Sequence, residues 1–334
     1  MSRRRRLPAI AVAAALVAGG CGAVGPTPRA AASRAPASGL AAPVPALPPA
    51  PPGAAGPSGA PGSPGPSVAA ARAGFAHVYL VVLENQEYGT IVGSADAPYL
   101  NGLFARYGLA TAMYGVTHPS EPNYIALVSG DTQGVRDDGV HDLGAPSLFD
   151  QVEAAGRTWR VYAQGYPGAC SATAAAPPVV DGPGRAGEYV RKHDPAISFT
   201  SISRSPSRCA DIVGLAGFSP AAADFEMVVP NQVNDMHSSS VQAGDQFLSA
   251  FLPSILLSPA FAAGSLLIVT FDEGTTDDHG GGHIATLLAT PGMKPGTRFA
   301  ALANHASVLR TVEEGWGMPP LGSAAAASPI PVTP

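Results

Sequence analysis

The sequence predicts one α/β domain in which helices cover both faces of a mostly parallel sheet. Strand-like and helix-like segments alternate along residues 73–321, which is typical of this class. Two predicted strands, within residues 77–85 and 265–274, are continuous apolar runs, which indicates burial on both faces of the sheet. The chain has 334 residues, of which 46% are hydrophobic and 13% are charged, so it can bury a large core.

Each element is predicted from its own pattern. Short apolar runs that end in polar or turn residues predict strands. Helical spacing of apolar residues, with Pro or Asn near the start and Gly at the end, predicts helices. Pro253 is expected to bend or break one helix. The predicted strands lie within residues 77–85, 159–165, 224–231, 265–274 and 283–292, and the predicted helices within residues 97–108, 122–130, 146–156, 241–257 and 304–317.

The N-terminus carries an export pattern. In residues 1–20, four arginines precede an apolar stretch and small residues, as in a secretory signal peptide. The segment ending at Cys21 resembles a bacterial lipoprotein acylation site, so we expect an exported protein tethered to the cell envelope by lipid. The alternative is an extracellular protein that loses Cys21 with its signal. Residues 21–72, rich in Pro and Ala, are predicted to be a disordered linker, and residues 322–334 a disordered tail.

The charge distribution argues against nucleic acid as a partner. Residues 73–334 contain 12 Lys and Arg against 24 Asp and Glu, a formal balance of −12. An acidic domain that handles phosphate needs a compensating positive charge, and a divalent metal ion is the expected source. After the signal peptide no segment is apolar for long enough to span a membrane, so membrane contact is expected only through the lipid anchor.

Two cysteines remain once Cys21 is acylated or removed. Because an exported protein meets an oxidising compartment, Cys170 and Cys209 are predicted to form a disulfide. Two unpaired thiols are the alternative.

Polar residues gather where the predicted strands end. Glu84 and Asn85 follow the first strand, residues 231–237 follow another, and Asp272 and Glu273 follow the most apolar one. Ligands of parallel sheets bind beyond the carboxyl ends of the strands, so these positions predict an active site. Surface turns would explain the first two groups equally well. Two adjacent buried carboxylates, however, need a partner, and hard divalent cations prefer oxygen ligands.

Ser120 lies two residues before Pro122, where a helix can begin. Its hydroxyl is either a helix cap or a nucleophile at the positive end of the helix dipole. His118 and Asn123 beside it favour the second interpretation, because both could bind an anion.

The remaining histidines differ in their settings. His283 begins a predicted strand and is a better ligand candidate than His279, which is expected to face solvent. His305 opens the last helix, where a neutral imidazole could bind a metal or contact phosphate. Structural or surface roles are predicted for His77, His141 and His193.

Together these blocks resemble the bacterial and fungal phosphoesterase family of secreted acid phosphatases and phospholipases C, a branch of the alkaline-phosphatase superfamily. The matching motifs are, in order, EN, HPSxPNY, PNxxxDMH, a strand ending in DE, GGH and HxSxLRTxE, between residues 78 and 321. The resemblance implies an alkaline-phosphatase-like fold and a hydrolase of phosphoric esters.

The resemblance also implies roles for the matching residues. Glu-Asn at the end of the first strand stands where the superfamily has Asp, and Asp-Glu stands where the superfamily has Asp-His. One oxygen-rich divalent metal site is therefore expected rather than two zinc ions. The implied metal ligands are Glu84, Asn85, Ser120, Asp272 and Glu273, the implied catalytic residues are Ser120, Asn123, His237 and His305, and the implied substrate-binding residues are His118, Asp235 and His283.

The implied reaction is an acid phosphatase reaction. Metal-activated Ser120 would attack a phosphomonoester of a small molecule or lipid, and water would hydrolyse the phosphoserine, while His237 or His305 protonates the leaving oxygen. A phosphodiesterase of phospholipase C type is the alternative. A lipoprotein that binds phosphate or metal without turnover is the alternative from another class.

Overall fold

The computed structural model describes residues 74–168, 170 and 189–334. The predicted signal peptide in residues 1–20, the acylated Cys21 and the linker in residues 21–72 lie outside the described residues.

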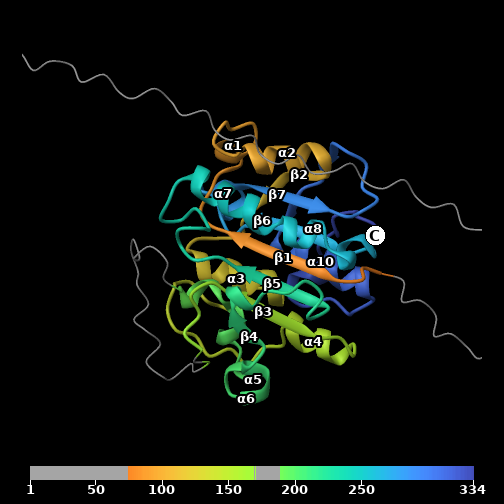
Figure 1. Ribbon diagram of the computed structural model, residues 1–334. Coiled ribbons are helices and arrows are strands. Elements are labelled where there is room, and N and C mark those ends of the chain that lie inside the picture. Colours follow the sequence, from red (N-terminus) through yellow and green to blue (C-terminus); the bar gives the residue numbers. More distant parts are fainter. Residues whose placement is uncertain (1–73, 169, 171–188) are drawn as a thin grey trace, which may run out of the picture. The chain divides into compact units, whose positions relative to one another are not determined.

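The described strands form a single mixed sheet, whose strands lie side by side through the domain in Figure 1. Its order is β4-β3-β5-β1-β6-β7-β2-β8, and β9 also pairs with β2. The strands from β4 to β6 are parallel, whereas β7 is antiparallel to both β6 and β2. The strands are β1 (Val78–Leu83), β2 (Gly108–Tyr114), β3 (Trp159–Ala163), β4 (Ile212–Gly214), β5 (Phe225–Val229), β6 (Leu266–Phe271), β7 (His283–Ala289), β8 (Thr297–Phe299) and β9 (Ala303–Asn304).

Helices cover both faces of this sheet, as predicted. The helices α2, α7, α8 and α9 pack in succession, and α3, α4 and α10 form a second group. In Figure 1, α7 and α8 lie in front of the sheet and α10 lies behind it. The helices are α1 (Tyr88–Ile91), α2 (Pro98–Arg106), α3 (Ser120–Ser129), α4 (Leu148–Ala154), α5 (Thr200–Ser203), α6 (Pro206–Cys209), α7 (Val241–Phe251), α8 (Pro253–Leu256), α9 (Pro259–Ala262) and α10 (His305–Trp316), with 3-10 turns η1 (Arg191–His193), η2 (Pro195–Ser198), η3 (Leu215–Gly217), η4 (Asp278–Gly280) and η5 (Gly322–Ala325).

Local sequence explains where these elements begin and end. All six residues of β1 and of β6 are buried, as expected of central strands covered on both faces. The Ser240 hydroxyl caps α7, and Asn304 caps α10. The predicted break at Pro253 is confirmed, because α8 begins there as a separate turn.

The strand β2 was not predicted. Residues 97–108 were expected to be a helix closed by Gly108, but α2 ends at Arg106 and Gly108 already begins β2. The sequence of β2, GLATAMY, has small residues and Thr111 among its apolar ones, and three of its seven residues are only half-buried. Pairing with β7 and β8, rather than local apolarity, holds it in place.

The prediction of a disordered tail in residues 322–334 is wrong. The Ser323 amide donates to the Gly130 carbonyl at 2.9 Å, and the Ile330 amide donates to Thr311 Oγ1 at 2.9 Å. Ala324 is fully buried and Ile330 is 4% exposed, so both belong to the core. A segment rich in Ala and Pro is therefore ordered by tertiary contacts with α3 and α10 that no local pattern reveals.

The predicted disulfide is also absent: Cys170 and Cys209 are both free thiols. Cys170 packs against the hydrophobic core, and Cys209 ends α6 beside Tyr166. Burial raises the pKa of the Cys209 thiol, which further reduces its thiolate fraction.

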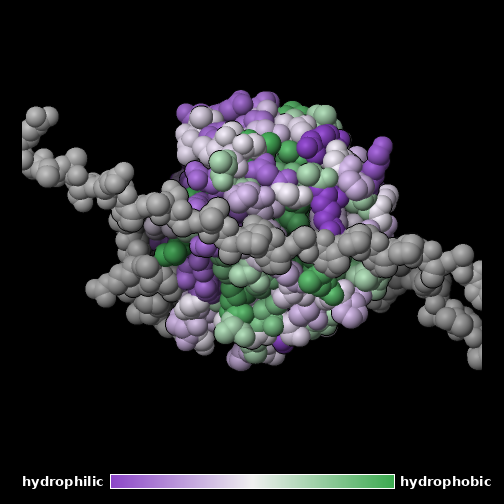
Figure 2. All heavy atoms as spheres, turned by 45° about the horizontal axis from the view of Figure 1, so that its top comes forward, coloured by the Kyte–Doolittle hydropathy of each residue, from purple (hydrophilic) through white to green (hydrophobic). Residues whose placement is uncertain are grey.

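The surface is mixed in polarity. On the face in Figure 2, hydrophilic and hydrophobic residues are interspersed. Among the described residues, only three large hydrophobic side chains are exposed by half or more, namely Val140, Leu257 and Leu302. Within residues 74–168 and 189–334, no helix has both the length and the apolarity needed to cross a membrane.

A buried carboxyl group in β5 should make folding stability depend on pH. Burial raises the pKa of Glu226 to about 7, and its Oε2 has no hydrogen-bond partner among the described residues. A raised pKa in the folded state means that its contribution to stability is complete below about pH 4.5 and is lost as pH rises to about 7. We expect Glu226→Gln to be more stable than wild type at pH 8, by up to roughly 3 kcal/mol, and equal to it at pH 4.

Urea unfolding at both pH values measures this difference. Glu314→Gln, a change of the same kind at an exposed position, is the control and should leave the pH dependence unaltered. Equal pH dependence in wild type and Glu226→Gln would show that the carboxyl group ionises freely in the folded protein.

Candidate active site

Three buried carboxyl groups meet at one edge of the sheet. Glu84 follows β1, Asp235 lies in the loop after β5, and Asp272 follows β6, which are adjacent parallel strands. Backbone bonds hold these ends together: the Glu84 amide donates to the Asp235 carbonyl at 2.9 Å, and the Asp272 amide donates to the Leu83 carbonyl at 3.0 Å. All three carboxylate residues are 0% exposed. The prediction that strand ends would gather these residues is confirmed.

The pKa values of all three carboxyl groups are raised above their usual values. Burial raises the pKa of Glu84 well above its usual value, and the charges of Asp272 and Asp235 raise it further. Burial also raises the pKa of Asp235, and that of Asp272 to about 6. One oxygen of each group, Oε1 of Glu84 and Oδ2 of each Asp, has no hydrogen-bond partner in the described part of the chain. Such a cluster attracts a cation.

Ser120 is the first residue of α3, so this helix begins two residues earlier than predicted. Its side chain is buried, and Oγ donates to Glu84 Oε2 at 3.1 Å. The hydroxyl therefore lies at the positive end of a ten-residue helix and beside a carboxylate that could accept its proton.

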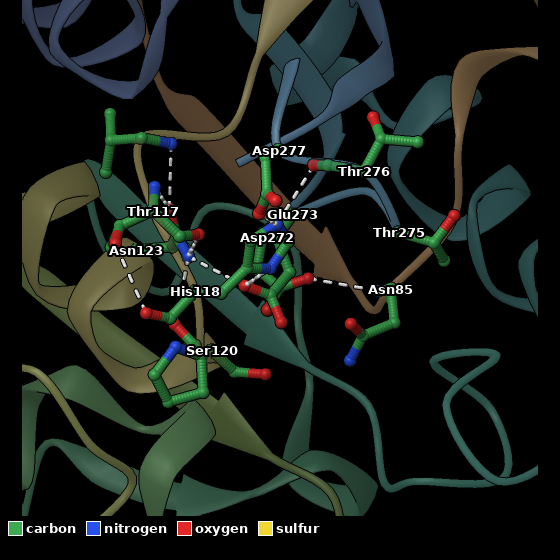
Figure 3. A network of polar contacts seen from close by, with 12 residues as sticks. Asn85, Thr117, His118, Ser120, Asn123, Asp272, Glu273, Thr275, Thr276 and Asp277 are labelled. Atoms are coloured by element: carbon green, nitrogen blue, oxygen red, sulfur yellow. Dashed lines mark hydrogen bonds and ion pairs between the residues drawn. The ribbon is translucent and has the colours of Figure 1, made fainter. Parts of the chain in front are cut away.

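His118 and Asn123 converge on Glu273, while Asn85 reaches Asp272 from the other side (Figure 3). Nδ1 of His118 lies 2.8 Å from Glu273 Oε2, and Nε2 lies 3.0 Å from the Thr276 carbonyl oxygen. The Asn85 amide donates to Asp272 Oδ1 at 3.0 Å. These contacts place three predicted site residues around Asp272 and Glu273, the two carboxylates that follow β6.

The structure gives Asn123 a different role from the predicted one. Its Oδ1 accepts from the amides of Val116 and Thr117 at 2.9 and 3.2 Å. Its Nδ2 donates to the carbonyls of Thr117 and Pro119 and to Glu273 Oε2. Because both ends of the carboxamide are engaged, Asn123 positions the loop before Ser120 rather than donating to a phosphoryl oxygen.

His193 is the main residue that sequence reasoning missed. It is 1% exposed, with Nε2 3.2 Å from Glu84 Oε1 and Nδ1 3.5 Å from Asp235 Oδ2. Burial lowers the pKa of this imidazole well below its usual value. The sequence feature that could have revealed His193 is Arg191–His193. It is the one run of three basic residues within residues 73–334, where acidic residues outnumber basic ones.

Lys192, in the same run, brings a positive charge to the site. Its Nζ lies 2.7 Å from Asp138 Oδ2, and its side chain is 8% exposed. Burial alone would lower the pKa of Lys192, but the bond and charge of Asp138 raise it above the usual value. Its charge acts on the carboxyl groups of Glu84, Asp235 and Asp272.

His237 lies at the more open side of the site. Its amide donates to Asp235 Oδ1 at 2.8 Å, and its ring centre lies 6.2 Å from that of His193. The residue is partly exposed, unlike His193. Burial and the charge of Lys192 lower the pKa of His237.

Two predicted histidines make other contacts. His283 stacks between Tyr88 and Tyr114, and its Nε2 lies 3.1 Å from the Thr111 carbonyl oxygen, so its substrate-binding role stays a prediction. His305 is fully buried and its Nε2 donates to the Asp272 carbonyl oxygen. Burial lowers the pKa of His305 to about 4, so it supports the end of β6 as a neutral ring and is a poor proton donor.

The donor chemistry of the site fits a divalent cation. Hard cations prefer carboxylate oxygens, and Oε1 of Glu84 and Oδ2 of Asp235 and Asp272 are such donors, although His193 already lies against the first two. Among the described residues, however, no group of three or more His, Cys, Asp or Glu side chains is arranged so that it could hold a metal ion. Asn85, another predicted ligand, contacts the cluster through its side-chain amide, which donates to Glu84 Oε2 at 3.2 Å.

Comparison with known proteins identifies the family of this chain. Residues 91–319 match the profile of the Phosphoesterase family. The phosphatidylinositol-3-phosphatase of Mycobacterium tuberculosis is 33% identical over 78% of this chain and 84% of its own length. An acid phosphatase of Aspergillus fumigatus is 29% identical over 74% of this chain, which spans 56% of that longer protein.

A solved structure shows the same fold. The lipoteichoic acid synthase LtaP from Listeria monocytogenes aligns with a TM-score of 0.52 over 74% of each chain. At 11% identity this likeness concerns the fold alone, and the chain has the predicted α/β architecture with a mostly parallel sheet. Because the family profile covers most of the folded domain, the chain belongs to the phosphoesterase family and is a hydrolase of phosphoric esters.

Proposed function

We propose that this chain is a metal-dependent acid phosphatase that cleaves phosphomonoesters through a phosphoserine at Ser120. The supporting observation is the contact between Ser120 Oγ and Glu84 Oε2, 3.1 Å long, within the buried carboxyl cluster that also contains Asp235 and Asp272. A hydroxyl at a helix N-terminus, next to a proton acceptor and a cation site, has the parts that an activated nucleophile needs.

A divalent cation would be held by Oε1 of Glu84 and Oδ2 of Asp235 and Asp272. When bound, it supplies positive charge that favours the ionised hydroxyl and offsets charge on the phosphoryl oxygens. Lys192 adds a fixed positive charge, which Asp138 holds in place.

The chain's own groups carry the protons in the proposed reaction. Ser120 Oγ attacks phosphorus, and its proton passes to Glu84 Oε2, which already accepts its hydrogen bond. The bond from phosphorus to the leaving oxygen breaks, and His237, the more exposed imidazole, gives that oxygen a proton. Water then attacks the phosphoserine and gives a proton to His237, while Glu84 returns its proton to Ser120 Oγ as the bond from phosphorus to that oxygen breaks. Phosphate is released, and both side chains regain their starting protonation states.

The names of the relatives favour monoesters over the phospholipase C alternative. Phosphatidylinositol-3-phosphatase and acid phosphatase both denote removal of a terminal phosphate. A phosphorylated lipid or small molecule is the proposed substrate class, and the site of action is proposed to be outside the cytoplasm, with Cys21 as the lipid anchor.

The test compares two substrates on the purified full-length protein. We expect hydrolysis of p-nitrophenyl phosphate that is lost with EDTA and restored by a divalent metal ion, and much slower hydrolysis of p-nitrophenyl phosphocholine. Turnover of the diester alone would support the phospholipase C alternative. No turnover of either substrate by folded, metal-loaded protein would support a binding lipoprotein.

A further inference from the structure

Two ion pairs lie next to the proposed nucleophile, and the proposed reaction uses only the charge of one lysine in them. Glu121, the residue after Ser120, accepts from Arg191 Nη1 at Oε1 over 3.3 Å, and both side chains are at most 2% exposed. Nζ of Lys192 lies 2.7 Å from Oδ2 of Asp138, and these side chains are 8% and 16% exposed. We call these four residues the Glu121–Lys192 network.

The two ion pairs are joined at Glu121. Its side chain pairs with Arg191, while its backbone amide donates to Asp138 Oδ1 at 3.0 Å. Asp138 therefore uses one oxygen for Glu121 and the other for Lys192. Because Arg191 and Lys192 are neighbours in η1, these contacts form a closed ring that links the first turn of α3 to η1 at two points.

Asp138 does for α3 what a local cap does for most helices. The first amides of a helix have no partner inside the helix. The residue before α3 is Pro119, and its side chain makes no capping bond. The Asp138 carboxylate accepts the Glu121 amide from 17 positions along the chain, and a negative charge at a helix N-terminus is favourable. Another segment of the chain thus fixes the start of α3, and Ser120 with it.

Arg191 holds that segment in place. Its Nη1 donates to the Gly139 carbonyl at 3.4 Å, and its Nη2 donates to the His141 carbonyl at 3.2 Å. The same guanidinium contacts Glu121. Arg191 therefore ties the segment that carries Asp138 to the start of α3.

The other end of η1 reaches the reacting atoms. Nε2 of His193 lies 3.2 Å from Glu84 Oε1, and Glu84 Oε2 accepts the hydroxyl of Ser120 at 3.1 Å. The His193 ring also stacks on Tyr124 of α3, with ring centres 5.1 Å apart and planes inclined by 12°. A shift of η1 relative to α3 would therefore disturb the groups that keep Glu84 beside Ser120.

Small displacements at this place matter for the reaction rate. A misplacement of about 1 Å can slow a reaction by roughly a hundred-fold. Buried ion pairs resist such movement, because separating the partners leaves a buried charge without compensation. The Glu121–Lys192 network is thus suited to keeping Ser120 Oγ against Glu84.

We propose that Asp138 is a positioning residue for Ser120, because its carboxylate joins the first turn of α3 to η1 through the Glu121–Lys192 network. This inference rests on the proposed function for the identity of the nucleophile. It goes beyond that function by giving Asp138 a second task besides holding the charge of Lys192. The two tasks are separable, since each carboxylate oxygen serves one of them.

Two substitutions of Asp138 separate these tasks. Asp138→Asn keeps an oxygen that can accept from the Glu121 amide but has no charge for Lys192, whereas Asp138→Ala keeps neither. For p-nitrophenyl phosphate we expect kcat of Asp138→Ala to be about ten-fold below that of Asp138→Asn, with KM values within about two-fold of each other. Asp138→Ser, whose side chain is too short to reach both partners, replaces Asp138→Ala if that variant does not fold. Equal kcat values would reduce Asp138 to the partner of Lys192 and overturn the proposal.

Hydrogen exchange, followed by NMR of the full-length protein, tests the connection without any turnover. In wild type the amides of Glu121 and His193 should be protected, since both donate hydrogen bonds. In Asp138→Ala we expect both to exchange at least ten-fold faster, although only the first loses its acceptor. In Asp138→Asn the Glu121 amide should keep its protection. Faster exchange at Glu121 alone would show that η1 does not depend on Asp138 and would overturn the proposal.

Asp142→Asn is the matched control. Asp142 lies in the same segment as Asp138, but its ion pair with Arg204 is on the surface, with side chains 40% and 67% exposed. This variant should have wild-type kcat and wild-type exchange at both amides. Coupled exchange with an unchanged kcat in Asp138→Ala would make the network purely structural and overturn its role in positioning. Coupled exchange in a wild type that hydrolyses no monoester would retain the network and reject the phosphatase.

Discussion

Ser120→Ala is expected to lower kcat for p-nitrophenyl phosphate by about four orders of magnitude or more, because it removes the attacking oxygen. The fold should survive, since the substitution removes the hydrogen bond from the hydroxyl to Glu84 but leaves the packing of α3 unchanged. Acid-quenched wild type should carry a phosphoserine after brief exposure to substrate, and the variant should carry none. Radiolabel transfer from substrate and mass spectrometry of the peptide around residue 120 measure this directly.

Ser249→Ala, in the exposed face of α7, is the matched control and should retain full activity. If Ser120→Ala kept more than a tenth of wild-type turnover, phosphorus would have to be attacked by another oxygen, and the nucleophile assignment would fail.

Asp272→Asn is expected to change activity and stability in opposite directions. Turnover at saturating metal should fall at least a hundred-fold, because the variant loses one of three buried carboxylates that would hold the cation. The metal-free protein should nevertheless unfold at a higher temperature than metal-free wild type. The reason is that one negative charge leaves a group of three that are fully buried together.

Thermal unfolding with and without added divalent metal ion separates the two effects. Wild type should gain stability from the metal, and Asp272→Asn should gain little. Asp278→Asn, at an exposed position, should behave like wild type in both assays. A variant that lost stability in the metal-free state would show that Asp272 is paired within the protein rather than held for a cation.

The parts of the fold that sequence predicts best are those in which local pattern and burial agree. The fully apolar β1 and β6 identified the centre of the sheet and, through their ends, Glu84 and Asp272. The strand β2 escaped prediction because it is partly exposed, and so its sequence has no apolar run. The C-terminal segment escaped for a related reason, since Ile330 is buried by distant helices and its neighbours are Ala and Pro.

The site was predicted where a residue follows a strand and missed where it does not. His193 lies in a short 3-10 turn, and its contact with Glu84 joins residues 109 positions apart (193 − 84). His283 and Asn123 show a different limit of sequence reasoning. A histidine at a strand end and an asparagine near a serine both suggested chemistry, yet aromatic stacking engages the first ring and loop bonds engage the second side chain. Sequence gives the position of a polar group but not the partner that already occupies it.

The contact between the C-terminal segment and α3 has a consequence for the timing of synthesis. The carbonyl of Gly130, at the end of the helix that begins with Ser120, is bonded by the amide of Ser323, nearly two hundred residues later. Domains form from the N-terminus as the ribosome extends the chain, but this helix end stays without its partner until Ser323 has been added and has emerged. The helix that begins with the proposed nucleophile therefore gains its last backbone contact late in synthesis, long after its own residues have been made.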